Sequence, residues 1–302
     1  MYIDLKDKWE YLGIADAILT SKTPIKPDMH LIVALISFWS PTSNTFVFSE
    51  GFLSPTLMDV SAMLSLLIDG IPIHHKMKCT QHCTIDIDIN GAALGYIRFM
   101  QKHKKHFNDV ITFKEETCFY LFWLCKFLIN SPSKRIITYY LPITIALANK
   151  HKLALVLFFL GSVYMFLFTT EPKDSIGGPL WFTQLWAYAY FPQLAPKPIP
   201  SVFSRSTCYA HLFTLSAYEP DHIPNFEDWF NLFSDKERVR FATYFLPFAE
   251  AKFTCLEMFL LGQGVNPLSS SLRVHVLQTR DLVVLQNKYS SFEVYSPHFL
   301  VR

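Results

Sequence analysis

The stretch GGPLWFTQLWAYAYFP, residues 177–192, contains six aromatic side chains and no charged one. Its apolar residues share a broad arc of a helical wheel, and only Thr183 and Gln184 form a narrow polar side. Pro179 suits the first position of a helix and Pro192 suits its end, so the glycines indicate a turn and not a phosphate-binding loop. The sequence therefore predicts a helix buried on nearly all sides, in preference to an aromatic platform that stacks on a ligand.

The composition is that of a folded chain with few charges. Hydrophobic residues make up 51% of the 302 residues and charged residues 17%, against about 25% charged in an average domain. We expect one domain over residues 1–302, and a division into two lobes, 1–110 and 111–302, is the alternative. Because so few charges are available to solvate the surface, we expect part of the apolar surface to meet a partner.

The net charge and the cysteine content indicate which class of ligand and which cellular compartment to expect. The net charge of +2 lacks the strongly basic footprint of a dedicated nucleic-acid binder. The N-terminal stretch carries charges where a secretory signal has an apolar run, so we expect no export. The cysteines are thinly spread, which indicates reduced thiols inside the cell: Cys79, Cys83, Cys118, Cys125, Cys208 and Cys255.

Apolar periodicity predicts a mainly α fold, a compact multi-helix domain with a few short β-strands or hairpins. The predicted helices cover residues 8–20, 28–39, 54–68, 92–107 and 115–129, and further helices open at Pro142 and Asn225. Alternation in NTFVFSEGF, residues 44–52, predicts a hairpin. The valine-rich tail predicts short strands and a last helix near residues 279–287.

SPTLMDVSAMLSLLIDG, residues 54–70, contains a helix-start signature. Ser54 is available as the N-cap, and Thr56 and Asp59 have the spacing of a capping box, so the helix is predicted to extend to about Ile68. This helix and the turn after it could also form half of a helix-turn-helix. The stretch contains no basic residue to contact phosphate, which argues against DNA recognition by this element.

LALVLFFLGSVYMFLFTT, residues 153–170, contains no charge and reaches the lower limit of a membrane-spanning length. Gly161 and Ser162 interrupt it, and buried helices of an aromatic-rich core produce the same pattern at this length. We interpret it as a central core helix and expect no membrane association, with a membrane span as the alternative.

Basic residues gather in QKHKKHF, residues 101–107, at the end of a predicted helix. Lys102, Lys104 and Lys105 suit the negative end of the helix dipole, so a solvated helix end explains them. The alternative is a set of phosphate contacts that gives weak DNA association.

HHKMKCTQHC gathers imidazole and thiol groups, the ligands that zinc prefers. Its candidate ligands are His74, His75, Cys79, His82 and Cys83. The spacing does not match a structural zinc site, and no second cluster follows, so we expect a polar loop and no metal. DIDING, residues 86–91, opens like a calcium loop with Asp86 and Asp88, but its twelfth position is Ile97 where a bidentate glutamate is required.

Catalytic signatures are missing from the sequence. It contains no Gly-x-Ser-x-Gly elbow, no Gly-Lys-Ser phosphate loop and no His-Glu-x-x-His helix. We therefore expect neither an enzyme nor a cofactor, and a cryptic metal-dependent enzyme that uses the His74 to Cys83 cluster with Asp86 and Asp88 is the least favoured alternative.

Three segments, in order, resemble the plant mobile domain, a family also labelled aminotransferase-like. They are residues 11–64, with FWSPTSNTFVFSEGFLSPTLMDV, residues 119–192, from FYLFWLCKFLI to GGPLWFTQLWAYAYFP, and FEVYSPHFLVR, residues 292–302. The chain departs from the family pattern at Tyr164-Met165-Phe166, where the tyrosine is usually followed by Arg-Asp. The residues that fit family motifs are each best explained as core or turn positions: Trp39, Pro41, Thr45, Phe46, Thr56, Asp59, Gly177, Gly178, Trp186 and Pro192.

The resemblance implies a largely helical, transposon-derived domain of nuclear proteins similar to those named for maintenance of meristems. Those proteins look like non-enzymatic factors for transposon silencing and genome integrity that act with a phosphatase-like partner. The aminotransferase-like label gains no support, because no lysine lies in a recognisable cofactor-binding context. We therefore expect a nuclear protein-interaction module, and a DNA-associated transposon accessory domain is the runner-up.

Overall fold

The fold of the chain was obtained as a computed structural model. It describes residues 2–22, 26–49, 51–74, 95–103, 110–129, 134–170, 178–191, 194–195, 224–235, 280–285 and 290–295. Within these ranges the chain is mainly helical, with a three-stranded sheet and a separate two-stranded hairpin. This architecture confirms the mainly α fold that the apolar periodicity predicts.

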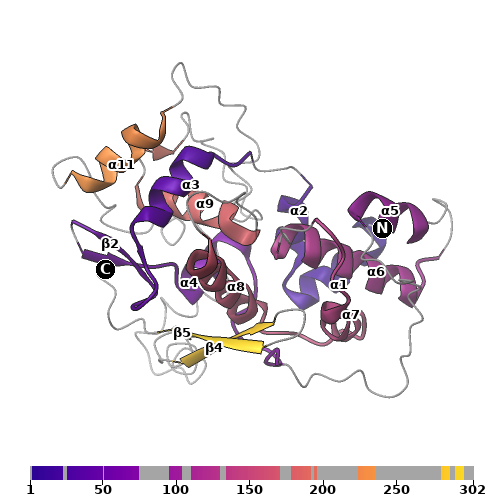
Figure 1. Ribbon diagram of the computed structural model, residues 1–302. Coiled ribbons are helices and arrows are strands. Elements are labelled where there is room, and N and C mark those ends of the chain that lie inside the picture. The colour runs from indigo at the N-terminus through magenta and orange to yellow at the C-terminus, as the bar shows by residue number, and fades with distance from the viewer. Residues whose placement is uncertain are drawn as a thin grey trace.

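The helices form two groups that share one hydrophobic core. The first group contains α3 (Met29–Ser37), α4 (Leu57–Leu64), α8 (Leu155–Thr169) and α9 (Trp181–Tyr190). The second contains α1 (Tyr2–Leu12), α5 (Tyr96–His103), α6 (Phe113–Trp123) and α7 (Leu141–Ala148). Figure 1 shows the first group on the left and the second on the right, with the short α2 (Ala15–Thr20) between them.

Helix α9 is the buried element that its sequence predicts. Each of its residues is buried, including Thr183 and Gln184, which form the polar side of the helical wheel. Gly178 begins the 3-10 turn η3 (Gly178–Leu180) before α9 with a φ of 75°. A Cβ atom at Gly178 would lie 2.5 Å from the Phe166 ring, so a turn with a close approach requires glycine here.

The run at residues 153–170 forms α8, a core helix of 15 residues. Ser162, in the middle of the run, is buried and donates its hydroxyl hydrogen bond to the Phe158 carbonyl oxygen within the helix. In the part of the chain that the structure describes, no helix is both long enough and apolar enough to cross a membrane.

The predicted hairpin at residues 44–52 is present and belongs to a sheet of three strands, ordered β1-β2-β3. The strands are β1 (Trp39–Ser40), β2 (Thr45–Phe48) and β3 (Gly51–Leu53), and both pairings are antiparallel. Phe46 and Phe48 of β2 are buried, whereas Val47 between them is exposed. The alternation therefore separates an inner face from an outer face, as period-two strands do.

The predicted helix over residues 8–20 is in fact two helices. Gly13 has a φ of 65° and separates α1 from α2. A Cβ atom at Gly13 would lie 2.4 Å from a side-chain atom of Leu67, so the chain turns sharply here against the segment that follows α4. The apolar spacing typical of a helix continues through Gly13 in the sequence, but packing against Leu67 separates the two helices at this residue.

Helix α4 begins with the predicted capping box. The Thr56 hydroxyl accepts a hydrogen bond from the Asp59 backbone N–H, and the Asp59 carboxylate accepts one from the Thr56 N–H. Thr56 is the N-cap, in place of the predicted Ser54. The helix ends at Ser65, which has a φ of 55°, and so does not reach Ile68.

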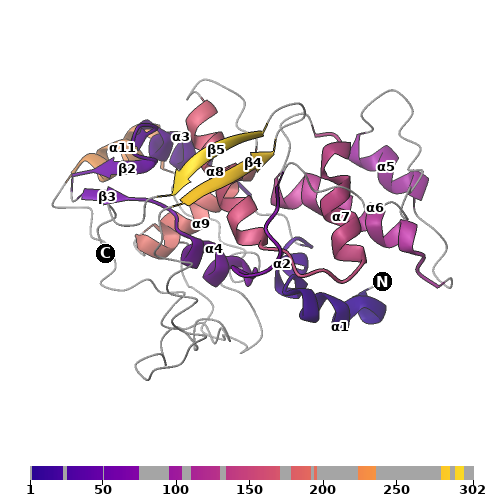
Figure 2. The same ribbon diagram turned by 90° about the horizontal axis from the view of Figure 1, so that it is seen from below.

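Two remaining elements pack on the first group. Helix α11 (Phe226–Ser234) is capped by Asn225, as predicted, and packs against α3. Strands β4 (Arg280–Leu285) and β5 (Ser290–Tyr295) form an antiparallel hairpin over α8, which Figure 2 shows from below. The helix predicted near residues 279–287 is wrong, because Leu282 and Val284 alternate into the core as strand residues.

Candidate functional site

The carboxylate of Asp59 joins α4 to α9. Asp59 is 0% exposed. Besides its cap contact with Thr56, its Oδ2 accepts a hydrogen bond from Trp186 Nε1 at 3.3 Å, and its Oδ1 accepts one from the Tyr190 hydroxyl at 3.2 Å. A buried carboxylate is costly unless it accepts such hydrogen bonds. Three residues that fit the family motifs, Thr56, Asp59 and Trp186, are therefore joined by hydrogen bonds in the core.

The aromatic residues of the same motifs surround this contact. The Trp39 ring packs on Phe46 with centroids 4.9 Å apart, and Phe46 stacks on Trp186 at 5.2 Å. Thr45 is buried and its hydroxyl pairs with Ser43 at 2.7 Å. These motif residues are part of the buried core at the β1–β3 sheet.

The remaining motif residues lie in turns or outside the described residues. Pro41 is exposed in the turn between β1 and β2. Gly178 occupies the left-handed turn before α9. Gly177 and Pro192 lie outside the residues that the structure describes.

A second polar contact involves Gln184, on the polar side of α9. Its Oε1 accepts a hydrogen bond from the Asp28 backbone N–H at 2.7 Å, and its Nε2 donates to the Lys26 carbonyl oxygen and the Tyr188 hydroxyl. The Asp28 carboxylate caps α3 and also accepts from Trp229 Nε1 of α11 at 3.3 Å. Burial, with a smaller contribution from Asp28, raises the pKa of Tyr188 to about 12. The polar side of α9 thus binds a neighbouring segment of the protein.

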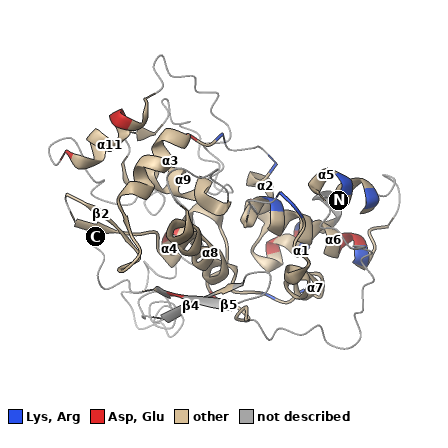
Figure 3. Ribbon diagram, viewed as in Figure 1, with Lys and Arg blue, Asp and Glu red and all other residues tan. Residues whose placement is uncertain are grey.

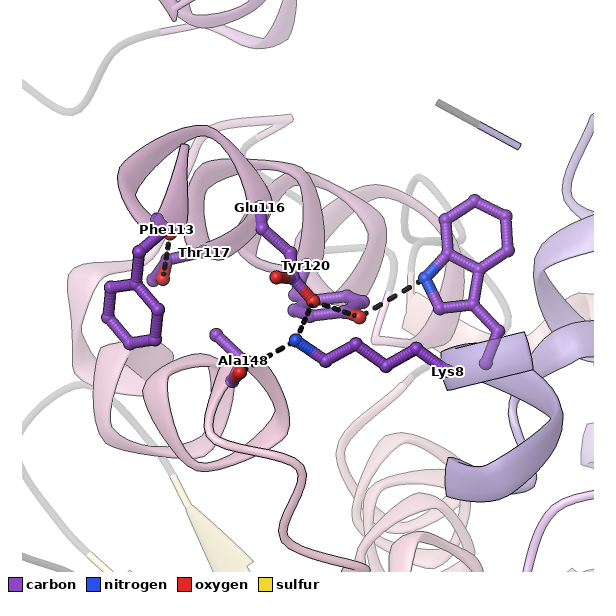
Figure 4. Close-up of polar contacts among 7 residues, drawn as sticks. Lys8, Phe113, Glu116, Thr117, Tyr120 and Ala148 are labelled. Carbon is purple, nitrogen blue, oxygen red and sulfur yellow. Dashed lines mark hydrogen bonds and ion pairs between the residues drawn. The ribbon is translucent and has the colours of Figure 1, made fainter. Parts of the chain in front are cut away.

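A third contact lies between α1, α6 and α7 (Figure 4). The Lys8 ammonium lies 2.5 Å from Glu116 Oε1 and donates to the Ala148 carbonyl oxygen at 2.7 Å. The Tyr120 hydroxyl donates to Glu116 Oε1 at 2.7 Å and accepts from Trp9 Nε1 at 3.1 Å. Burial, followed by the contact with Glu116, raises the pKa of Tyr120. The sequence offers no signal for this contact, because its partners come from distant segments.

The candidate metal cluster falls almost wholly outside the described residues. His74 ends a described stretch, and His75, Cys79, His82 and Cys83 lie beyond it, as do Asp86 and Asp88. Across the ranges that are described, no group of three or more histidine, cysteine, aspartate or glutamate side chains is placed to hold a metal ion.

The basic end of α5 is partly described. Lys102 is exposed in the last turn of α5, and Arg98 is exposed one turn earlier. Figure 3 shows basic residues on α5, whereas α3 and α9 carry no lysine, arginine, aspartate or glutamate. Lys104 and Lys105 lie outside the described residues.

The cysteines of α6 and its continuation are buried, as predicted for core thiols. Cys118 lies in α6, and Cys125 lies in the π-helix Leu124–Leu128 that continues it. Burial raises the pKa of Cys118 to about 11 and that of Cys125 to about 12. Neither thiol is a thiolate at neutral pH, and the thiolate is the nucleophilic form.

The outer face of the β1–β3 sheet carries exposed apolar side chains. Val47 of β2 is paired in register with Phe52 of β3. Their exposed fractions are 43% and 46%. Residues paired in this way on one face of an antiparallel sheet are direct neighbours, so the two side chains form one apolar surface. We call Val47 and Phe52 the hairpin pair.

A protein-family profile matches nearly the whole chain. The plant mobile domain profile matches residues 13–298. The chain belongs to the plant mobile domain family. In this plant mobile domain, Trp39, Phe46, Asp59 and Trp186 are buried.

A relative of this plant mobile domain is the serine/threonine-protein phosphatase 7 long form homolog of Arabidopsis thaliana. The two are 28% identical over 179 residues, which cover 54% of this chain and 13% of that protein. The chain thus spans a small part of the length of this curated relative. No solved structure matches the chain.

Proposed function

We propose that this plant mobile domain is a non-enzymatic, transposon-derived protein-interaction module of the nucleus. The observation that carries the proposal is the hairpin pair, Val47 and Phe52, which the sheet presents together to solvent. Burying apolar surface of this kind against a partner is favourable, and aromatic side chains are enriched at the centres of protein interfaces.

The sheet holds the hairpin pair in a fixed position. On its inner face, Phe46 and Phe48 are buried and pack on Trp186 and Phe191 of the core. A surface built on a rigid element loses little conformational entropy when it binds. The inner aromatic residues therefore support an outer binding surface.

The proposed partner is a phosphatase-like nuclear protein. The family resemblance suggests such a partner. The Arabidopsis relative is named as a homolog of a serine/threonine-protein phosphatase. The region that matches this chain makes up 13% of the length of that relative. That region is therefore one part of a much longer protein, as expected of a module that works beside other domains.

The test is a pull-down from plant nuclear extract, with and without nuclease, followed by mass spectrometry. The variant changes Val47→Ser and Phe52→Ser together, and the control is Ile97→Ser on α5, where Ile97 is 72% exposed. We expect wild type and control to retain a phosphatase-like protein after nuclease treatment, and the double variant to lose it. Retention by the double variant would contradict the assigned surface, and loss of every partner on nuclease treatment would favour nucleic-acid association.

The cellular part of the proposal concerns transposon silencing, genome integrity and meristem maintenance, which the family resemblance suggests. A fluorescent fusion of the chain is expected in the nucleus. Loss of the gene is expected to raise transposon transcripts, and the wild-type chain should restore silencing where the hairpin-pair variant does not. Unchanged transcripts in the mutant plant would contradict this part of the proposal.

A second candidate is a DNA-associated accessory domain, which the exposed basic row of Arg98 and Lys102 on α5 favours. Each phosphate contact contributes about −0.9 to the slope of log binding constant against log salt. If both residues contact phosphate, the variant with Arg98→Ala and Lys102→Ala should bind duplex DNA more weakly, with a slope smaller by about 1.8. An unchanged slope would contradict contacts by α5.

A further inference from the structure

Four consecutive polar residues, NKHK, follow the last residue of α7. We call them, residues 149–152, the basic loop. All four are exposed, and two lysine ammonium groups flank the imidazole of His151. Only 17% of the residues in the chain are charged. The basic loop is therefore a local concentration of positive charge on a protein with few charges.

The end of α7 does not account for these lysine side chains. The last four carbonyl groups of a helix lack a partner within the helix, and basic side chains often serve them. In α7 the carbonyl oxygens of Ile145, Ala146 and Leu147 accept from backbone N–H groups of the basic loop, at 2.9 Å each. The Ala148 carbonyl oxygen accepts from the Lys8 ammonium at 2.7 Å, as Figure 4 shows. The lysine side chains of the basic loop are thus not required as caps.

The backbone holds the basic loop in place. At the end of the loop, the Lys152 carbonyl oxygen accepts a hydrogen bond from the Ile71 N–H at 2.8 Å. Lys150 has a φ of 63°, in the left-handed region where glycine is the favoured residue after a helix. A residue with a Cβ atom is strained there, and such strain is common at binding sites. The fold therefore places a cation where stability alone would favour glycine.

An exposed aromatic ring lies beside the basic loop. Tyr11 of α1 is 55% exposed, and the Lys152 ammonium lies 4.5 Å from the centroid of its ring. A cation near the face of an aromatic ring is favourable. Among the residues that the structure describes, no carboxylate lies within ion-pair distance of Lys150, His151 or Lys152. The site thus combines positive charge that no ion pair neutralises with an accessible aromatic surface.

We propose that the basic loop and Tyr11 form a contact site for single-stranded nucleic acid. Lys150 and Lys152 pair with phosphates of the strand, and a base stacks on the Tyr11 ring. Positive charge along the backbone beside an aromatic ring for the bases is the combination by which proteins bind single strands. An acidic peptide has no base to stack on Tyr11, and in a duplex the bases already stack on one another.

This site is separate from the hairpin pair, so the inference does not rest on the protein-interaction function proposed above. It also differs from the basic row on α5 in its ligand, because the basic loop has an exposed aromatic ring beside it. Disruption of the basic loop should therefore leave capture of a protein partner by the hairpin pair unchanged.

The binding test measures the anisotropy of a fluorescent oligothymidine of about 12 nucleotides, a length within the range of single-strand sites, with the full chain at low salt. Tyr11→Ala should weaken binding about tenfold through lost base stacking. Replacing Lys150 and Lys152 together by alanine should reduce the slope of log binding constant against log salt by about 1.4, since each phosphate contact on a single strand contributes about −0.7. Lys6→Ala, which removes an exposed lysine of α1, is the control and should leave this slope unchanged.

Lys150→Gly separates binding from stability. Glycine relieves the left-handed backbone, so the variant should have a Tm equal to or above that of wild type. It should nevertheless bind the oligonucleotide about threefold or more weakly, because one phosphate contact is lost. No binding by wild type, or unchanged affinity of the Tyr11 and lysine variants, would overturn the proposal. Tighter binding of polyglutamate or of a duplex than of the single strand would overturn it as well.

Discussion

Trp186 donates its indole hydrogen bond to the carboxylate of Asp59, with Nε1 and Oδ2 3.3 Å apart. The same oxygen accepts the Thr56 N–H at the start of α4. One carboxylate thus caps one helix and anchors another that lies much later in the chain.

Replacing Asp59 with alanine is expected to lower the free energy of unfolding by about 3 kcal/mol. It removes a helix cap, worth about 1 kcal/mol, and leaves the buried Trp186 and Tyr190 donors without this acceptor, at about 1 kcal/mol or more each. Thr56→Ala, which removes one half of the capping box, should cost about 1 kcal/mol. Urea unfolding monitored by circular dichroism measures the free energy of unfolding of both variants. An equal loss in the two variants would contradict a stabilising contact between Asp59 and α9.

Lys8→Met is expected to destabilise the chain by about 3–5 kcal/mol, because it leaves the Glu116 carboxylate buried without its ammonium partner. Lys8→Met combined with Glu116→Leu should recover much of the loss, since both charges are removed. A double-mutant cycle in urea measures the coupling. Simple additivity of the two single changes would contradict a buried ion pair. Lys6→Met, in an exposed pair with Glu10, is the control and should change stability by less than about 1 kcal/mol.

Gly178→Ala is expected to destabilise the chain by more than about 1 kcal/mol. The φ of 75° is unfavourable for alanine, and the added Cβ would lie 2.5 Å from Phe166. Gly95→Ala is the matched control, because a Cβ atom there meets nothing within 4 Å, and its effect should stay within about 0.5 kcal/mol. Thermal unfolding compares the two, and equal shifts in Tm would contradict strain at Gly178.

Cys118 and Cys125 are expected to resist alkylation in the native state at pH 8. Their pKa values are raised by burial from the ordinary value of 9.0 to about 11 and about 12. A thiol with a raised pKa stabilises the folded chain, and this stabilisation is fully present below pH 9. The stabilisation is lost as the pH rises from 9 toward the folded-state pKa, because the unfolded chain then releases protons that the folded chain keeps. Iodoacetamide labelling read by peptide mass spectrometry, with and without urea, is the measurement. Rapid native labelling at either position would contradict the buried thiol.

The local elements of the fold follow from the sequence, because local interactions specify them. The capping box of Thr56 and Asp59, the Asn225 cap and the alternation of Phe46, Val47 and Phe48 each act within a few residues. The nearly continuous apolar surface of α9 likewise predicts its burial. Such signals do not depend on which distant segment packs against them.

Tertiary structure decided how the polar residues are used. On a helical wheel Gln184 is simply a polar position of α9. In the folded chain, the backbone of residues 26–28 forms hydrogen bonds with its side-chain amide. Residues 280–285 form a strand because β5 pairs with them and α8 covers them.

What the sequence by itself determined is the mainly helical class, the capping boxes of α4 and α11 and the burial of α9. Only the tertiary structure decided that Asp59 holds Trp186, that Lys8 meets Glu116 and that Val47 and Phe52 face solvent together. The physical reason is the range of the interactions. Propensity and capping act within a helical turn or two, whereas burial of a polar group depends on partners more than 100 residues away, as in the pairing of Trp9 with Tyr120 111 positions later.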